Sequence, residues 1–215
     1  MKRLIVILEI LTILVAANAA AEDEKGIFEP GDHCVAYRTI KDILFAVDAE
    51  IIGRSCEVSA ALAASESGGA PRVIVEVPVK SLKSGNILRN RAVADLLGAK
   101  TQPNLRFTSS PIDVETIRAD VARGQLRLAG VLAIGGKDFP LDFPLQLLEH
   151  QGRHYVEGHL ATTFAAFEVE VPTVALGLIA RPHDALELIV HLELERVAGL
   201  EEWAREQGLD PLPSR

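Results

Sequence analysis

The chain has 215 residues, is 48% hydrophobic and carries a net charge of −8. This length suits one large β domain with a buried core. The acidic balance argues against nucleic acid as a partner, and against anionic lipid headgroups, because phosphates are repelled and no basic cluster with interleaved aromatic residues offsets the repulsion. We therefore expect neutral or apolar partners, or a local site that the sum of charges does not reveal.

The N-terminus has the pattern of a secretory signal peptide. Lys2 and Arg3 precede an apolar run that ends in a small-residue cleavage site, Ala17-Asn18-Ala19. The run is shorter than the roughly 20 apolar residues that span a bilayer. This predicts export to the periplasm without stable membrane insertion after cleavage, and a mature chain that starts at Ala20 with a net charge of −9, since the leader holds two cations and one carboxylate. Glu9 weakens the apolar run, so an uncleaved N-terminus lying on the membrane stays open as the alternative.

The two cysteines, Cys34 and Cys56, both lie in the expected mature chain. One even pair in an exported protein favours a disulfide, which would add about 3 kcal/mol of stability. Two free thiols, or a redox or metal pair, are the alternatives. We expect no metal site, because His154 and His159 are five residues apart in a predicted strand and face opposite sides, and His150 lies across a turn.

Short apolar stretches separated by turn residues predict about eight strands. They lie at residues 43–52, 55–63, 73–79, 105–109, 125–134, 139–148, 155–164 and 185–196, with turns at Gly53-Arg54, at Gly135-Gly136-Lys137-Asp138 and at Gln151-Gly152. A helix is expected over residues 89–98, where Val93, Leu96 and Leu97 share one face and Gly98 is the stop signal. A second short helix follows Gly199, with Leu200 and Trp203 either packed on the exterior of the domain or sealing one end.

Eight strands with short hairpin links favour an antiparallel barrel. A barrel of this size is either filled by its own side chains or holds one small ligand. Alternation alone does not separate these cases. The candidates for the interior are Phe45, Val47, Val75, Phe107, Leu126, Leu128, Phe143, Phe164, Phe167 and Leu188.

Three segments in a fixed order resemble the YceI-like family of secreted lipid-binding proteins. They are VKSLKSGN at 79–86 with Arg89-Asn90, GQLRLAGV at 124–131 with FPLDFPL at 139–145, and TFAAFEVEVP at 163–172 leading into LELIVHL at 186–192. The resemblance implies an all-β fold, an extended eight-stranded antiparallel lipocalin-like barrel with a short inserted helix and a C-terminal helix. The expected organisation is a signal peptide at 1–19, a leader at 20–40, the barrel domain at 41–198, and a C-terminal helix and tail at 199–215.

The resemblance also implies a periplasmic carrier that holds a polyisoprenoid, such as a quinone tail, in a hydrophobic tunnel. Arg89 and Asn90 would then bind the polar head of the lipid, whereas the alternative is that Arg89 caps carbonyl groups or pairs with Asp95. Likewise, the apolar residues of the first helix either line the tunnel or only pack on the sheet. The expected ligand-binding residues are Phe45, Val47, Val75, Leu88, Arg89, Asn90, Val93, Leu97, Phe107, Leu126, Leu128, Phe143, Phe164 and Phe167.

We expect no catalysis and no cofactor other than a bound polyisoprenoid or quinone-like lipid. The sequence has no Gly-x-Ser-x-Gly, P-loop or His-Glu-x-x-His motif, and its carboxylates are scattered. The alternative function is a stress-related or structural barrel with a packed interior that acts through its surface. A homodimer stays open.

Overall fold

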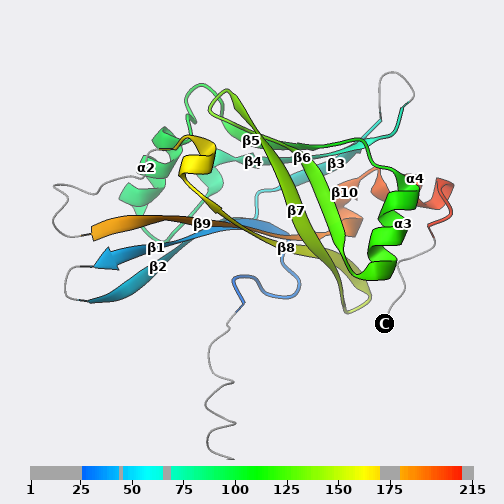
Figure 1. The fold of residues 1–215 in the computed structure, drawn as a ribbon, viewed down its shortest axis with the longest axis horizontal. Helices are drawn as coiled ribbons and strands as arrows, with labels where there is room; N and C mark the ends of the chain where they lie inside the picture. Colours follow the sequence, from blue (N-terminus) through cyan, green and yellow to red (C-terminus); the bar gives the residue numbers. More distant parts are fainter. Residues whose placement is uncertain (1–25, 44–45, 65–68, 170–179, 210–215) are drawn as a thin grey trace, which may run out of the picture.

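A computed structural model describes residues 26–43, 46–64, 69–169 and 180–209. The predicted signal peptide and Phe45 lie outside these residues. The described chain is mostly β (Figure 1). Its ten strands are β1 (Cys34–Ile43), β2 (Ala46–Ser55), β3 (Ser59–Ala63), β4 (Arg72–Pro78), β5 (Asn104–Ser109), β6 (Leu126–Ile134), β7 (Lys137–His150), β8 (Arg153–Thr163), β9 (Ala180–Glu193) and β10 (Val197–Ala198).

Three α-helices and three short 3₁₀ helices complete the described elements. The α-helices are α2 (Ile87–Leu96), α3 (Val114–Arg123) and α4 (Leu200–Glu206), and the 3₁₀ helices are η1 (Val79–Ser81), η2 (Ala165–Phe167) and η3 (Leu194–Arg196). Figure 1 shows α2 at one end of the molecule and α3 with α4 at the other.

All ten strands form one sheet with the order β10-β3-β4-β5-β6-β7-β8-β9-β1-β2. Neighbours are antiparallel, except that the two-residue β10 runs parallel to β3. Strands β10 and β2 are the edges of the described sheet, which curls into a half-barrel. The predicted all-β, mainly antiparallel domain is confirmed in its coarse form, but the described sheet is a half-barrel of ten strands, so the predicted count of eight strands is wrong.

The two strands that were not predicted are β1, in the N-terminal part of the domain, and the two-residue β10 near its C-terminal end. Strand β1 starts at Cys34, within the expected leader, and forms a hairpin with β2. The turn predicted at Gly53-Arg54 is also wrong, because both residues lie inside β2. Gly53 is needed for another reason: a Cβ there would lie 2.2 Å from Cε1 of Tyr37, whose ring crosses the glycine.

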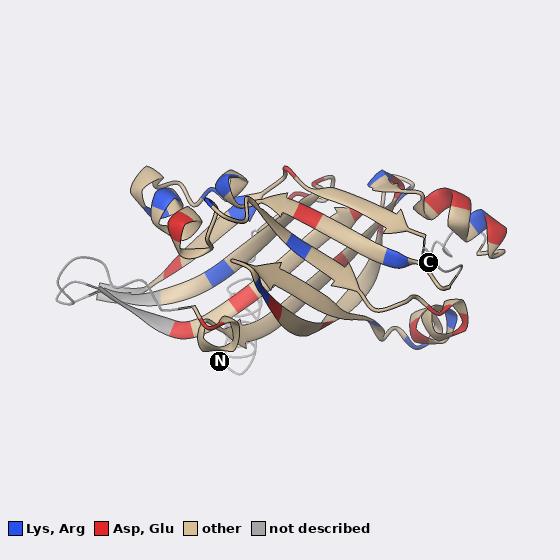
Figure 2. Ribbon diagram, turned by 90° about the horizontal axis from the view of Figure 1, so that it is seen from above, with Lys and Arg blue, Asp and Glu red and all other residues tan. Residues whose placement is uncertain are grey.

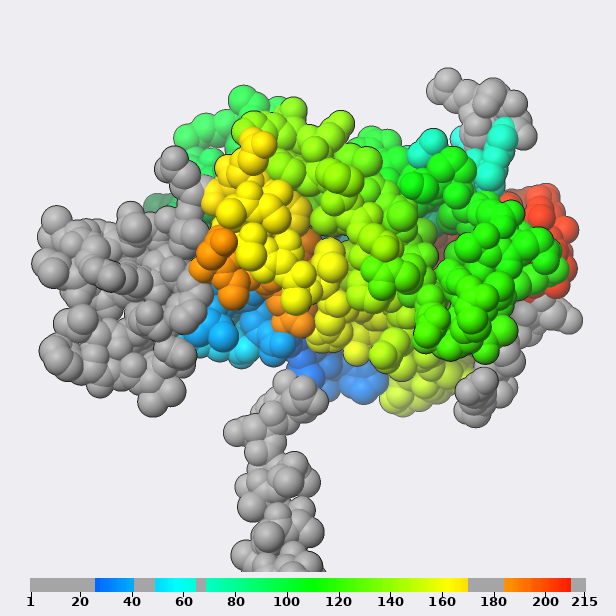
Figure 3. All heavy atoms as spheres, viewed as in Figure 1, coloured from blue at the N-terminus to red at the C-terminus, as the bar shows by residue number. Residues whose placement is uncertain are grey.

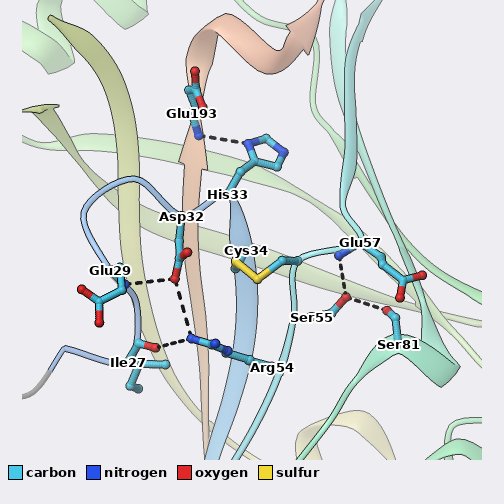
Figure 4. Close-up of a disulfide and its surroundings, with 11 residues drawn as sticks. Ile27, Glu29, Asp32, His33, Cys34, Arg54, Ser55, Glu57, Ser81 and Glu193 are labelled. Carbon is cyan, nitrogen blue, oxygen red and sulfur yellow. Dashed lines mark hydrogen bonds and ion pairs between the residues drawn. A yellow bond between two sulfur atoms is a disulfide. The ribbon is translucent and has the colours of Figure 1, made fainter. Parts of the chain in front are cut away.

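A disulfide holds this hairpin at its open end. Cys34 and Cys56 are bonded, with their Cα atoms 4.1 Å apart, which confirms the predicted pairing (Figure 4). Ser55, which comes directly before Cys56 and ends β2, is buried, and its Oγ lies 2.5 Å from Oγ of Ser81. These contacts tie the β2 edge to the segment that follows β4.

A reciprocal backbone pair continues this link between the β2 edge and the segment after β4. The N–H groups of Arg54 and Lys83 each donate to the carbonyl of the other at 2.9 Å. The curled sheet is therefore drawn together along part of its open side.

An apolar cavity between three helices

The curled sheet encloses a cavity of about 1220 Å³. Ligand pockets for small molecules usually have volumes of about 300–1,000 Å³, so this cavity is large enough for a sizeable apolar ligand. Its lining is overwhelmingly aliphatic and aromatic. The interior is thus hollow, which contradicts the alternative of a barrel packed throughout by its own side chains.

The aliphatic lining follows from the alternation of side chains along each strand, since every second side chain faces the same side of the sheet. In β9, the cavity residues Leu186, Leu188, Val190 and Leu192 lie at every second position, with Glu187 and His191 among the residues between them. Ile189, also between them, is buried and touches the cavity as well. The same alternation in β7 directs Leu141, Phe143, Leu145 and Leu147 inward. Figure 3 shows the outer surface of this side of the molecule, where β6, β7 and β8 lie next to one another.

One glycine in β6 shapes the cavity wall. Gly130 occupies an inward position between Leu128 and Leu132, and a Cβ there would lie 2.6 Å from Cζ of Phe107 and 2.5 Å from the carbonyl oxygen of Thr108. The missing side chain leaves room for the ring of Phe107, which comes from the neighbouring strand β5. The aromatic lining at this point depends on that glycine.

Helix α2 forms the wall at one end of the cavity, with the side chains of Leu88, Val93, Leu96 and Leu97 facing it. The helix begins at Ile87, close to the predicted start, because the side chain of Asn86 caps it by accepting from the N–H groups of Leu88 and Arg89, both at 3.0 Å.

Helices α3 and α4 form the other end. Ile117 and Val121 of α3 and Leu200 and Trp203 of α4 line the cavity there. Arg118 connects the two helices, since its guanidinium donates to the carbonyl of Gln207 at 2.7 Å. Of the two roles considered for Leu200 and Trp203, their position in the lining agrees with sealing one end.

Most of the polar groups in the cavity lining lie near the helices at its two ends, and the hydroxyl of Thr39 on β1 donates to the carbonyl of Ala185. Tyr37 and Arg89 lie at the α2 end, and burial raises the pKa of the Tyr37 phenol despite the nearby Arg89 guanidinium. His154 and Glu195 lie toward α4, where Nδ1 of His154 is 3.0 Å from Glu195 Oε1. An elongated apolar molecule would thus find most of the polar groups near its ends.

The two polar residues predicted to bind a lipid head, Arg89 and Asn90, both hold the turn before α2. Oδ1 of Asn90 accepts from N–H and Oγ of Ser84 at 2.9 and 2.7 Å, and Asn90 does not line the cavity. Arg89 donates to Ser84 Oγ at 2.7 Å and to its carbonyl at 2.5 Å, while also lining the cavity. Asp95 pairs instead with Lys100 at 3.0 Å. Arg89 therefore caps a carbonyl, as the structural alternative predicts.

The histidines lie on different sides of the sheet. His154 lines the cavity, whereas His159 is on the outer face, where its Nδ1 lies 3.0 Å from Glu187 Oε1. Burial raises the pKa of Glu187, but hydrogen bonds from His159 and Arg38 outweigh burial and hold that pKa below the ordinary 4.5. In the part of the chain that the structure describes, no three His, Cys, Asp or Glu residues are grouped so that they could hold a metal ion.

Most of the residues expected to bind a ligand meet around this one cavity. Asn90 does not line it, Phe45 is not described, and Val47 lies in β2 without a described side chain. Residues in the lining are Val75, Leu88, Arg89, Val93, Leu97, Phe107, Leu126, Leu128, Phe143, Phe164 and Phe167.

The sequence analysis missed Tyr37 and the whole of α3. Tyr37 lies in β1, a strand not predicted. Helix α3 did carry a signal, since Asp113 caps it by accepting from Thr116 N–H at 2.9 Å and Gly124 ends it with φ +65°.

A model of the YceI-like domain matches residues 36–194. No match was found among curated proteins. Among solved structures, Burkholderia cenocepacia BcnA is 23% identical with a TM-score of 0.54, and the alignment covers 74% of this chain and 95% of that one.

Two further structures are similar. A mutant Campylobacter jejuni YCEI protein with a monobromobimane guest is 16% identical with a TM-score of 0.50, covering 81% of this chain and 93% of that one. A polyisoprenoid binding domain from Saccharophagus degradans is 15% identical with a TM-score of 0.48, covering 74% and 92%. The two structures with TM-scores of 0.54 and 0.50 support the fold alone, because their identities are below 25%. The family model matches residues 36–194, which is most of the chain. The protein therefore belongs to the YceI-like family.

Proposed function

We propose that this protein is a periplasmic carrier that holds a polyisoprenoid or another long apolar lipid in its cavity. The observation that carries this proposal is the apolar cavity of about 1220 Å³ that extends from α2 to α3 and α4. Each methylene group moved from water into such an environment contributes about 0.8 kcal/mol, so a chain of many such groups binds without specific polar contacts.

The distribution of polar groups favours a chain over a compact polar ligand. A compact polar ligand needs several donors and acceptors that converge on it, but most polar groups of the lining lie toward the two ends, and the hydroxyl of Thr39 already donates to a backbone carbonyl. An isoprenoid tail needs none along its length, and a quinone or alcohol head at either end would meet groups such as Tyr37 or His154.

The disulfide supports the periplasmic location. Disulfides persist in oxidising compartments, and the bond between Cys34 and Cys56 closes the β1–β2 hairpin of the cavity wall. In the described residues, no helix has the length and apolar character to cross a membrane.

The direct test is to identify what the protein carries. The chain is exported with its own leader, purified without detergent or denaturant, and extracted with organic solvent for mass spectrometry. A polyisoprenoid or similar long-chain lipid near one molecule per protein is expected. An extract without such a lipid, together with failure of the refolded protein to take up isoprenoid alcohols or quinones, would refute the carrier function.

A further inference from the structure

Two adjacent large apolar residues at the start of α2 are exposed to solvent. Ile87 is 69% and Leu88 is 71% exposed, whereas the other large hydrophobic residues that stand out in the described chain are only 38–39% exposed. The Asn86 cap fixes this first turn of the helix, so both side chains are presented from an ordered element. Single exposed apolar residues are common, but two neighbours with this exposure form a patch that needs an explanation.

This patch is continuous with the cavity. Leu88 belongs to the lining, as do Asn86 before it and Arg89 after it. Because Leu88 both lines the cavity and is mostly exposed, it marks an edge where the cavity wall meets the outside. Ile87, in contrast, does not line the cavity and is exposed on the outside of the protein.

Positive charge surrounds the same patch. Residues 80–100 contain five cations and one carboxylate, a net charge of +4 in a chain whose total is −8. The carboxylate, Asp95, is already paired with Lys100. Lys80, Lys83 and Arg91 are exposed, and no ion pair between described residues involves them. Figure 2 shows the cations on α2 and on the turn beside it.

We propose that this face, residues 80–91, docks onto anionic phospholipid bilayers and brings the cavity edge to the lipid surface. Exposed cations attract lipid phosphates, and neighbouring apolar side chains insert at the boundary between headgroups and acyl chains. The two features occur together at the cavity edge, where an apolar chain moving between bilayer and cavity would avoid water. The purpose of docking rests on the proposed carrier function, but docking itself is measured without any cargo.

The experiment is co-sedimentation of the mature protein with vesicles. One set contains equimolar phosphatidylglycerol and phosphatidylcholine, and the other contains phosphatidylcholine alone. We expect binding to the anionic vesicles that weakens as salt is raised, because exposed charges are screened. The double variant Lys80→Gln/Lys83→Gln should bind about thirtyfold more weakly, since each basic residue at a membrane surface contributes about fivefold. Ile87→Ser should weaken binding about tenfold.

Two control variants remove the same kinds of side chain, two cations or one exposed apolar residue, at positions outside residues 80–91. Arg123→Gln/Arg127→Gln lowers the net charge equally, from exposed positions at α3 and the start of β6. Leu148→Ser removes an apolar side chain that is 38% exposed on β7 and outside the cavity lining. Both controls should bind anionic vesicles as the wild type does, and thermal unfolding of every variant checks its fold.

The outcomes separate docking from carrying. The docking proposal would be overturned by any of three results: equal binding to both kinds of vesicle, no binding to either, or the same loss of affinity in the variants and in the controls. An absence of binding would point to a protein partner for this face. Lys80, Lys83 and Ile87 do not line the cavity, so their variants should still yield lipid on extraction. If the wild-type protein yields no lipid on extraction, the carrier function is refuted, but the measured binding to vesicles is unaffected.

Discussion

Replacing Phe107 with aspartate should abolish lipid binding while the fold persists. Phe107 is in the middle of the cavity wall, paired with Val75 of β4 and Leu132 of β6, and all three side chains line the cavity. The ring is only partly buried because it faces the hollow interior. In the empty protein, an aspartate at this position can remain hydrated by water in the cavity.

The expected loss follows from desolvation of that carboxylate. A bound apolar chain displaces the water around Asp and leaves the charge without a partner, at an effective cost of several kcal/mol. A cost of about 4 kcal/mol weakens binding about a thousandfold. The apolar surroundings in the loaded protein raise the pKa of the introduced carboxyl, so the loss is largest at neutral pH. It shrinks as the pH falls and disappears below about 3.9, where the group is protonated in both the empty and the loaded protein.

The assay is lipid recovery by mass spectrometry, followed by titration of the delipidated protein with an isoprenoid alcohol at several pH values. Phe107→Leu keeps the wall apolar and should bind within about tenfold of wild type. Val131→Asp places the same charge on the outer side of β6, where the side chain is 39% exposed, and should bind normally. Wild-type recovery of lipid from a folded Phe107→Asp variant would show that the cavity is not the binding site.

Three other changes test the fold that supports the cavity. Replacing both Cys34 and Cys56 with serine removes a link across 22 residues and should cost about 3 kcal/mol, a fall of roughly 6–12 °C in Tm, with no further fall when reductant is added. Gly53→Ala should cost about 1–3 kcal/mol in denaturant unfolding, because the new Cβ meets the ring of Tyr37; a neutral result would mean that the ring moves aside freely. Glu187→Gln should reduce stability at neutral pH. Because the folded pKa of this carboxyl is below 4.5, its contribution is complete above that value and is lost as the pH falls through the folded pKa, so the variant and wild type should converge in acid unfolding.

Local signals in the sequence predicted the elements whose ends are set by their own residues. The first helix was expected at 89–98 and occupies 87–96, with Gly98 in the left-handed region at φ +70°. The β6–β7 hairpin forms at Gly135 and Gly136, which have φ values of +58° and +85°. At these positions the backbone conformation itself requires glycine.

The errors arose where the role of a residue depends on distant parts of the chain. Gly53 resembles a turn residue in the sequence, but the structure needs it because Tyr37 from the neighbouring strand lies over it. Strand β10 has two residues and exists only because Val197 and Ala198 pair with β3, more than a hundred residues earlier. Neither case has a local pattern that could have predicted it.

The hollow interior could not be predicted for the same reason. Leu128 alternates with exposed neighbours in β6, Arg127 and Ala129, and this pattern is the same whether Leu128 packs against another side chain or lines an empty volume. The difference depends on the curl of the sheet and on helices that are far apart in the sequence. Helix α2 lines one end, and α3 and α4 line the other, where Arg118 donates to the carbonyl of Gln207 across 89 residues. Alternation thus identified which side chains face inward, and only the placement of the three helices shows that they surround a cavity.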